Sequence, residues 1–269
     1  MQNVMVTGAA GQVAGFLRPF LRKRFARLIL TDRVDPGPLE PGEEFHPADL
    51  NDADALRAAM DGVEGVIHLG GQPTEADWDT VHAANIAGLY TFYKAARASG
   101  VTRIVYASSV HAVGFYDRET RIDENARTRP DGYYGVSKAL GEALASLYAD
   151  KHGLRTLSIR IGNVNLTPID TRRLSIWVHP EDLFQLCEIG LTHADIHNQI
   201  VFGMSDNARG WWDNDTAFGL GYAPRHRSED HVEVAQRGDG PPDAVGDLFQ
   251  GGKFCSDGFS GDLERTRRH

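Results

Sequence analysis

The sequence is poor in cysteine and has no long apolar run. Its 269 residues include two cysteines, Cys187 and Cys255, far apart in the chain. A disulfide framework is therefore not expected. The simplest interpretation is a protein that works in a reducing compartment. No apolar stretch approaches the ~18 residues that a membrane-spanning helix needs. The opening MQNVMVTG lacks the charged and apolar segments of a secretory signal. We expect a cytoplasmic protein with no membrane partner.

Positive charge is also scarce, because 28 Lys and Arg face 37 Asp and Glu, for a net charge of −9. This balance, without any run of Lys or Arg, excludes a nucleic-acid-binding surface. The histidines are scattered without metal-ligand spacing, so no metal is expected. Apolar residues make up 41% of the chain, which is typical of a packed globular protein.

Strand-like and helix-like segments alternate over residues 1–162. This alternation predicts βαβ units and a doubly wound parallel α/β sheet of the Rossmann type. The expected strands are residues 3–8, 27–32, 65–71, 103–109 and 155–162, and the expected helices are 12–24, 51–60, 78–98 and 133–151.

The alternation of strand-like and helix-like segments ends after Gly162. One further helix (179–191) and strand (199–205) are expected, followed by a region rich in Gly, Pro, Asp and Trp. We therefore divide the chain into a nucleotide-binding domain, residues 1–162, and a small C-terminal substrate-binding lobe, residues 163–269. Such a lobe is expected over the carboxyl ends of the strands, where these sheets bind ligands.

The segment VTGAAGQVA follows the first strand and opens a helix with the spacing Gly8-x-x-Gly11-x-x-Ala14. Gly8 permits a tight turn, Gly11 lets backbone N–H groups approach a pyrophosphate, and Ala14 lets helix and strand pack closely. The pattern predicts dinucleotide binding; the alternative is a purely structural turn.

Asp32 ends the second strand, 24 positions after Gly8. A carboxylate there can accept both ribose hydroxyls of an adenosine and repel a 2′-phosphate, which favours NAD. Arg33 could tolerate that phosphate, so NADP stays open. Asp49, followed by Leu50, could contact the adenine or simply cap a helix.

Tyr134 lies four residues before Lys138 in RPDGYYGVSK, so the two share a helix face, whereas Tyr133 points elsewhere. An ammonium beside a phenol lowers its pKa. Moving that pKa from ~10 to near 7 needs roughly 4 kcal/mol, which Lys138 and a charged nicotinamide together could supply. Ser109 ends a strand at the ligand crevice and can hold the reacting oxygen, with Ser108 on the opposite face.

These motifs, together with Asn85 in NIAG, resemble the short-chain dehydrogenase/reductase family. The segment HLGGQ is similar to its extended branch, the NAD-dependent epimerases and dehydratases that act on sugars. The segments TGAAGQ, HLGG, NIAGLY, RIGN and GWWDN resemble the bacterial uronate dehydrogenases nearly end to end. The resemblance implies NAD-dependent oxidation of glucuronate or galacturonate at the anomeric carbon to the aldarolactone.

The resemblance also implies residue roles. Tyr134 is the expected base, Lys138 tunes it and Ser109 holds the substrate hydroxyl. His111 lines the sugar site, and Arg172 binds the uronate carboxylate with help from Asn163. Expected cofactor contacts are Gly8, Gly11, Gln12, Val13, Asp32, Arg33, Asp49, Leu50, Leu69, Gly70, Gly71, Asn85, Tyr134 and Lys138.

Three positions in the expected substrate site depart from the family pattern. Pro73 and Asn163 stand where Ser is usual, and Val110 stands where Asn is usual. Each alters one polar contact, which affects selectivity among uronates rather than reaction type. From the residues alone, Arg172 and Arg173 could instead be a surface pair bound to Glu181 or Asp182. Trp211 and Trp212 could stack a sugar or anchor the C-terminal lobe.

Two other functions would use parts of the same pattern. A nucleotide-sugar epimerase or dehydratase uses the same Ser, Tyr and Lys but usually has a larger C-terminal lobe than the 107 residues, 163–269, available here. A dinucleotide-sensing regulator often lacks the catalytic Tyr or Lys, and both are present. Apolar helices at 78–98 and 133–151 could pair between subunits, so a homo-oligomer is expected.

Overall fold

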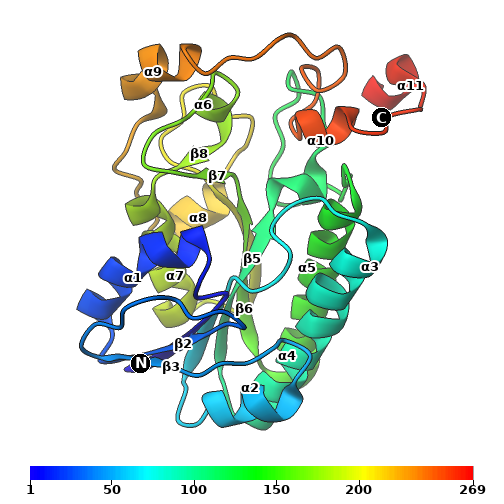
Figure 1. The fold of residues 1–269 in the computed structure, drawn as a ribbon. Helices are drawn as coiled ribbons and strands as arrows, with labels where there is room; N and C mark the ends of the chain where they lie inside the picture. The colour runs from blue at the N-terminus through cyan, green and yellow to red at the C-terminus, as the bar shows by residue number, and fades with distance from the viewer. Residues whose placement is uncertain (269) are drawn as a thin grey trace.

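A computed structural model describes residues 1–268 and shows a seven-stranded sheet covered by helices on both faces (Figure 1). The strand order is β3-β2-β1-β4-β5-β6-β9, and every pair is parallel. The predicted doubly wound α/β sheet is confirmed. The strands are β1 (Asn3–Thr7), β2 (Arg27–Thr31), β3 (Glu43–Phe45), β4 (Gly65–His68), β5 (Arg103–Ser109), β6 (Arg155–Ile161) and β9 (Asn198–Gly203).

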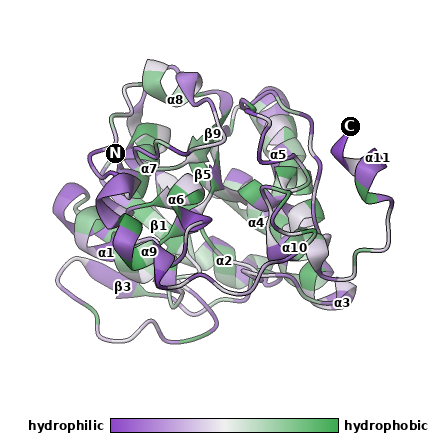
Figure 2. Cartoon of the chain, turned by 90° about the horizontal axis from the view of Figure 1, so that it is seen from above, coloured by the Kyte–Doolittle hydropathy of each residue, from purple (hydrophilic) through white to green (hydrophobic). Residues whose placement is uncertain are grey.

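The sheet is buried on both faces because successive side chains of a strand point to opposite sides. In β1, Val4 and Val6 pack with helices α1 (Gln12–Arg24) and α7 (Pro180–Thr192). Met5 packs on the other face with α2 (Ala53–Ala59), α4 (Gly88–Ala98) and α5 (Tyr133–His152). Figure 2 shows hydrophobic segments gathered around the sheet and hydrophilic ones in the outer helices and loops. No helix within residues 1–268 has both the length and the apolar character to span a membrane.

The helical segment predicted over residues 78–98 is interrupted by a π-helical turn. It consists of α3 (Trp78–Val81), a π-helical segment His82–Ala87, and α4. π-helical turns inside helices are frequent at functional sites. Here the turn contains Asn85, one of the predicted site residues.

Two elements that the sequence-based division places in the C-terminal lobe belong to the sheet layer. Strand β9 pairs with β6, and α7 packs against α1 on one face of the sheet. The division at residue 162 therefore cuts through the sheet, because the chain leaves it after β6 and later returns. The segments outside the sheet layer are β7 (Asn163–Val164), α6 (Arg173–Ile176), β8 (Trp177–Val178), α8 (Asp215–Gly219), a 3-10 helix (Ser228–His231), α9 (Val232–Gln236), α10 (Lys253–Ser256) and α11 (Leu263–Arg267).

A small apolar cluster joins these segments to the carboxyl end of the sheet. Trp212 is fully buried and stacks on Phe202, with ring centroids 4.8 Å apart. Its indole N–H donates to Gln250 Oε1 over 2.8 Å. Val110, which directly follows β5, lies in the same cluster. Trp212 is thus an anchor of the C-terminal segments on the core rather than a sugar platform.

A buried polar network fixes the position of α5 on the sheet. Glu142, on α5, accepts from the Ser108 hydroxyl over 2.6 Å and pairs with Arg160 of β6 through two bonds of 2.9 Å. Ser108 therefore faces away from the crevice, as predicted. Since Glu142 is one turn beyond Lys138 and Ser108 is next to Ser109, this network sets the distance between the helix and the strand that carry the predicted catalytic groups.

Candidate active site

The loops after β1 and β4 meet closely at the carboxyl edge of the sheet. Gly8 has a φ of 67°, and a Cβ atom there would lie 2.8 Å from the backbone nitrogen of Gly70 and from the backbone carbon of Leu69. The Thr7 hydroxyl accepts from the Gly70 N–H over 3.1 Å. Only glycine fits at position 8, because any side chain would collide with the second loop.

The amino end of α1 is open to an anion. Gly11 is the N-cap residue and has no capping side chain, and no acidic residue lies in the first turn, which begins with Gln12 and Val13. The N–H groups of such a helix end carry partial positive charge. This end fits the pyrophosphate of a dinucleotide, as the sequence predicts.

Asp32 lies beside the same turn. Its carboxylate accepts from the backbone N–H of Ala10 over 3.1 Å and of Val34 over 3.2 Å. Arg33 is 75% exposed at its side chain and lies 3.7 Å from the Asp49 carboxylate. Asp32 is therefore better suited to bind ribose hydroxyls than a 2′-phosphate. Arg33, which could bind that phosphate, lies instead toward Asp49.

Asp49 and Leu50 shape the neighbouring loop rather than cap the helix, because the N-cap of α2 is Asp52. Asp49 Oδ1 accepts from the backbone N–H of Asn51 over 2.8 Å. Leu50 packs against Gly70, because a Cβ atom added to Gly70 would lie 3.2 Å from Leu50 Cδ1. Both residues therefore adjoin the loops that the glycine turn brings together.

Asn85 ties the loop after β4 to the helix that carries the two tyrosines. Its side-chain oxygen accepts from the Gln72 N–H over 2.6 Å, and its amide donates to the Gln72 carbonyl and to Ser137 Oγ, each over 3.0 Å. Gly71 has a φ of 137°, and a Cβ there would meet Asn85 Oδ1 at 2.5 Å. The Asn85 side chain is thus a structural clamp next to the crevice.

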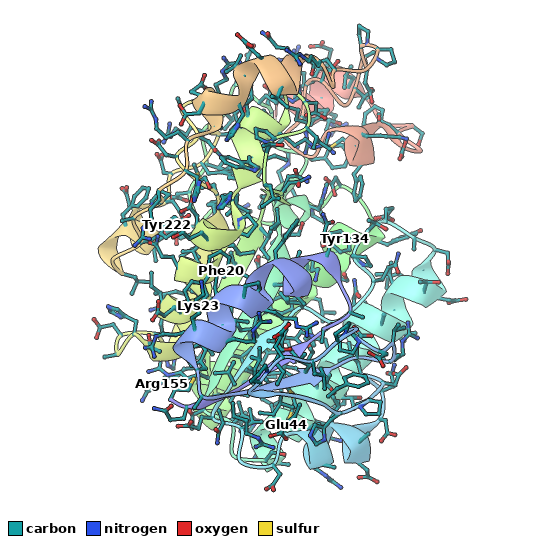
Figure 3. All side chains as sticks on the ribbon, turned by 60° about the vertical axis from the view of Figure 1, so that its left-hand side comes forward. Phe20, Lys23, Glu44, Tyr134, Arg155 and Tyr222 are labelled. Atoms are coloured by element: carbon teal, nitrogen blue, oxygen red, sulfur yellow. The ribbon has the colours of Figure 1, made fainter. Side chains whose placement is uncertain are left out.

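The structure brings Tyr134, and not Tyr133, next to Lys138. The Lys138 ammonium lies 5.3 Å from the centroid of the Tyr134 ring and donates to the Ala107 carbonyl over 2.8 Å. Tyr134 is 8% exposed, whereas Tyr133 is 51% exposed. Figure 3 shows Tyr134 between the sheet layer and the C-terminal helices. The shared helix face predicted from the four-residue spacing is present.

The chain's own groups raise the pKa of the Tyr134 phenol. Burial raises the pKa of Tyr134 to about 12, more than the nearby Ser109 hydroxyl lowers it, and the Asp131 charge raises it further. Burial also lowers the pKa of Lys138 to about 8. Desolvation thus opposes the lowering of the phenol pKa that is expected from Lys138, whose ammonium lies over the ring while its hydrogen bond goes to Ala107. The tuning role of Lys138 stays a prediction.

Ser109 ends β5 and begins a 3-10 helix, Val110–Val113, where its hydroxyl accepts from the His111 N–H over 3.2 Å. The Val110 side chain is 2% exposed and packs in the apolar cluster, so only its backbone can face a substrate. His111 turns back toward Tyr134, with ring centroids 5.8 Å apart in an edge-to-face arrangement. The predicted Ser109, His111 and Tyr134 are therefore neighbours.

Phe254, Asp131 and Glu75 are site residues that the sequence analysis missed. The Phe254 ring of α10 stacks on His111 at 4.0 Å and lies edge-on to Tyr134 at 6.4 Å. Asp131 Oδ2 is 2.7 Å from His111 Nδ1. Glu75 accepts from the backbone N–H groups of Tyr133 and Tyr134, each over 2.9 Å. No sequence motif signals Phe254, which reaches the site only through folding.

Arg172 has no carboxylate partner within residues 1–268. Its guanidinium donates to the Gln250 carbonyl, from Nη2 over 2.5 Å and from Nε over 3.2 Å. Burial, followed by the charges of Arg173 and Arg118, lowers the pKa of Arg172 to about 10. Arg173 instead forms an ion pair with Asp170. The alternative of a pair bound to nearby acids such as Glu181 or Asp182 therefore holds for Arg173, whose acid is Asp170, and fails for Arg172.

The other predicted substrate contacts differ in burial. Asn163 begins β7, and its side-chain oxygen is buried without a partner within residues 1–268. A buried polar atom of this kind is costly unless a ligand or water satisfies it. Pro73 is exposed in the loop after β4, two residues before Glu75. Contact of either residue with a substrate stays a prediction.

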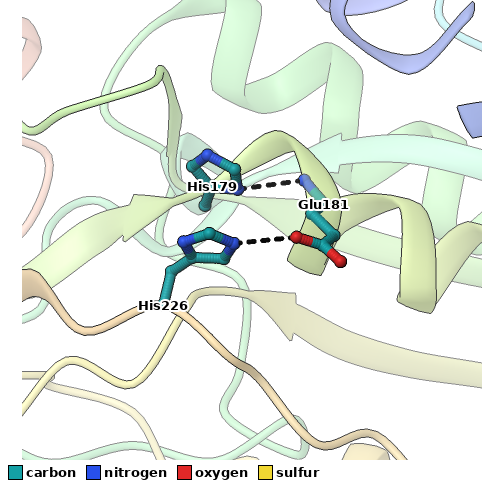
Figure 4. A group of neighbouring side chains, drawn as sticks. All are labelled: His179, Glu181 and His226. Atoms are coloured by element: carbon teal, nitrogen blue, oxygen red, sulfur yellow. Dashed lines mark hydrogen bonds and ion pairs between the residues drawn. The ribbon is translucent and has the colours of Figure 1, made fainter. Parts of the chain in front are cut away.

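One group outside this site has the composition of a metal site. His179, Glu181 and His226 have potential ligand atoms within 4.8 Å of one another (Figure 4). The two imidazoles stack with centroids 3.5 Å apart, so their lone pairs run nearly parallel rather than converge on one ion. His179 Nδ1 accepts from the Glu181 N–H, and Arg225 pairs with the Glu181 carboxylate over 2.8 Å. This geometry is that of a hydrogen-bonded stack.

A surface hollow of about 530 Å³ lies at the amino ends of the strands and not at this site. Met1, Glu64 and Leu191 are among the residues that line it, and none of the predicted site residues does. The polar groups described above converge at the opposite edge, where parallel sheets place their ligands.

The chain is similar over nearly its whole length to known enzymes. The model of the NAD dependent epimerase/dehydratase family matches residues 4–175. A uronate dehydrogenase from Pseudomonas syringae pv. tomato is 40% identical over 264 residues, 97% of this chain and 95% of the relative. One from Pseudomonas putida is 41% identical over 255 residues, 94% and 95% of the two chains.

Solved structures agree with the sequence relatives. A mutant uronate dehydrogenase from Agrobacterium tumefaciens, complexed with NAD, superposes with a TM-score of 0.91 at 39% identity, covering 95% of this chain and 97% of that chain. The resemblance inferred from the glycine turn and the tyrosine–lysine pair is therefore confirmed, and the chain belongs to the NAD dependent epimerase/dehydratase family.

Proposed function

We propose that this protein is an NAD-dependent uronate dehydrogenase, which oxidises glucuronate or galacturonate at the anomeric carbon to the aldarolactone. The observation that carries the substrate class is Arg172, a partly buried guanidinium without a carboxylate partner within residues 1–268. A guanidinium binds a carboxylate through parallel hydrogen bonds, and the uronate supplies that missing anion. The uronate dehydrogenases described above share this chain's full length.

The chain offers a complete set of contacts for NAD. The pyrophosphate fits the amino end of α1 and the glycine turn, and the adenosine ribose fits Asp32. When bound, NAD supplies the hydride acceptor for the oxidation. The residues that would hold it are Gly8, Gly11, Gln12, Val13, Asp32, Arg33, Asp49, Leu50, Leu69, Gly70, Gly71, Asn85, Tyr134 and Lys138.

The chain's own residues orient the sugar and move its proton. Arg172, with help from Asn163, holds the carboxylate end, while Ser109 and His111 hold the reacting hydroxyl and its neighbours, and Pro73 is a further substrate contact. Tyr134 as phenolate accepts the proton of the anomeric hydroxyl, and Lys138 beside it stabilises that phenolate. Because burial raises the pKa of Tyr134 to about 12, a further positive charge in the site would favour the phenolate.

We also propose that the protein works as a homo-oligomer in the cytoplasm. Helix α5 exposes an apolar stripe formed by Tyr133, Val136, Leu140 and Leu147, which are 51%, 39%, 38% and 48% exposed. The spacing of three, four and seven residues places them on one side of the helix, which suits pairing with the same helix of a second copy. Both cysteines are free and buried, which supports a reducing compartment.

Purified protein mixed with NAD and either uronate should accumulate NADH, followed by absorbance. An epimerase returns its cofactor to the starting state, so it would show no net NADH.

Tyr134→Phe should reduce turnover by a factor of about 10² or more, since a general base is removed, and should leave NAD binding intact. Tyr133→Phe is the matched control and should keep wild-type turnover. Wild-type protein that binds NAD but oxidises neither sugar would contradict the proposal.

Arg172→Met should raise the KM for the uronate by about 10- to 100-fold, because a charge-assisted bidentate contact is lost. Arg173→Met is the matched control, since that side chain is already paired with Asp170. Steady-state kinetics at saturating NAD measures both. Equal effects of the two substitutions would show that Arg172 has no special contact with the substrate.

Leu147→Asp should shift the protein to a smaller species in light scattering coupled to gel filtration, because a charge would enter the apolar stripe. Leu39→Asp, at a residue that is 47% exposed in a loop, is the control and should leave the molar mass unchanged. A wild-type protein that is monomeric at high concentration would refute the oligomer.

A further inference from the structure

We propose that Asp131 is a positioning residue that fixes the tautomer of His111, so that His111 Nε2 accepts a hydrogen bond from a hydroxyl group of the sugar. This inference rests on the proposed function for the identity of the substrate. It assigns a role to a buried carboxylate that does not itself reach the reacting atoms.

The contact between the two side chains determines where the imidazole proton lies. Asp131 Oδ2 is 2.7 Å from His111 Nδ1, and the Asp131 side chain is 0% exposed while that of His111 is 18% exposed. An ionised carboxylate can only accept hydrogen bonds. Nδ1 therefore donates this hydrogen bond, and in the tautomer that this contact selects the lone pair lies on Nε2.

The second ring nitrogen is available to a ligand. No residue within 1–268 forms a hydrogen bond with His111 Nε2. The atom is also not one of the fully buried polar atoms without a partner, so a ligand can reach it. The ring is held between Phe254, stacked at 4.0 Å, and Tyr134, edge-on at 5.8 Å. The imidazole is thus held in place beside the phenol that we propose as the base.

The surroundings of Asp131 leave it no other charged partner. A Cβ on Gly114 or Gly251 would lie 1.9 or 2.0 Å from Asp131 Oδ2, so both glycines pack directly against the carboxylate. Cys255 Sγ is 4.0 Å from the same oxygen, and Asp131 Oδ1 has no hydrogen-bond partner within residues 1–268.

Burying a carboxylate with a single strong partner is unfavourable for stability. Second-layer carboxylates that receive a histidine N–H are a general means of fixing the tautomer and ring orientation of a functional imidazole. The arrangement of Asp131 behind His111 has this form, and it also links the C-terminal segment 251–255 to the sugar site.

Asp131→Asn tests the role, because asparagine has the same shape and its amide can donate to Nδ1. That donation would favour the tautomer with the proton on Nε2, which can no longer accept from the sugar. The KM for the uronate should rise about tenfold, the loss of one hydrogen bond to a substrate hydroxyl, while kcat and the KM for NAD stay within about twofold.

A double-mutant cycle distinguishes positioning from a general packing effect. His111→Phe keeps an aromatic ring for stacking but removes both nitrogens, and it should raise the uronate KM by a similar factor. Adding Asp131→Asn to His111→Phe should then have no further effect on KM. Asp182→Asn is the matched control, since Asp182 is also fully buried but bonds to Ser205 and to backbone N–H groups far from His111 in sequence.

The ring nitrogens report the tautomer without any catalysis. Nitrogen-15 NMR of the wild-type protein, with the His111 signal identified by His111→Phe, should show the proton on Nδ1. Asp131→Asn should move it toward Nε2, and Asp182→Asn should not. A wild-type His111 protonated on Nε2 alone, or additive KM effects in the cycle, would overturn the proposal. If wild-type protein oxidised neither uronate, the proposed function would fail, while the NMR result would still decide how Asp131 acts on His111.

Discussion

Desolvation of Tyr134 and Lys138 at the carboxyl edge of the sheet is the constraint on which the rest of the site depends. Burial shifts the two pKa values toward each other, to about 12 for the phenol and about 8 for the ammonium, because it disfavours the charged form of each side chain. A further positive charge in the site therefore favours the phenolate. An oxidised nicotinamide would bring such a charge and would couple proton transfer to cofactor binding.

The fold holds these groups in place through polar contacts behind them. Glu142, Arg160 and Ser108 lock α5 to β5 and β6, and Glu75 binds the two N–H groups at the start of α5. The catalytic helix is thus fixed at both its amino end and its middle. Such preorganisation lets the protein orient a hydroxyl and a hydride acceptor without rearranging during the reaction.

How much the sequence predicts depends on how local each constraint is. The turn at Gly8 and the shared helix face of Tyr134 and Lys138 follow from neighbouring residues, so both were predictable. The contacts of Phe254 with His111 join residues 143 positions apart, 254 minus 111, and no local pattern encodes them. Strand β9 was assigned to the wrong layer because the chain leaves the sheet after β6 and returns only at Asn198. The raised Tyr134 pKa depends on burial, which spacing alone does not reveal.

The most direct test of this coupling is the pKa of the Tyr134 phenol in the free and NAD-bound protein. Carbon-13 NMR of labelled tyrosine, with the Tyr134 signal identified by Tyr134→Phe, measures it over a pH titration. The account predicts a value near 12 in the free protein and a decrease of several units with NAD. An equal pKa in both forms, or a free protein whose phenol already titrates near neutral pH, would contradict it.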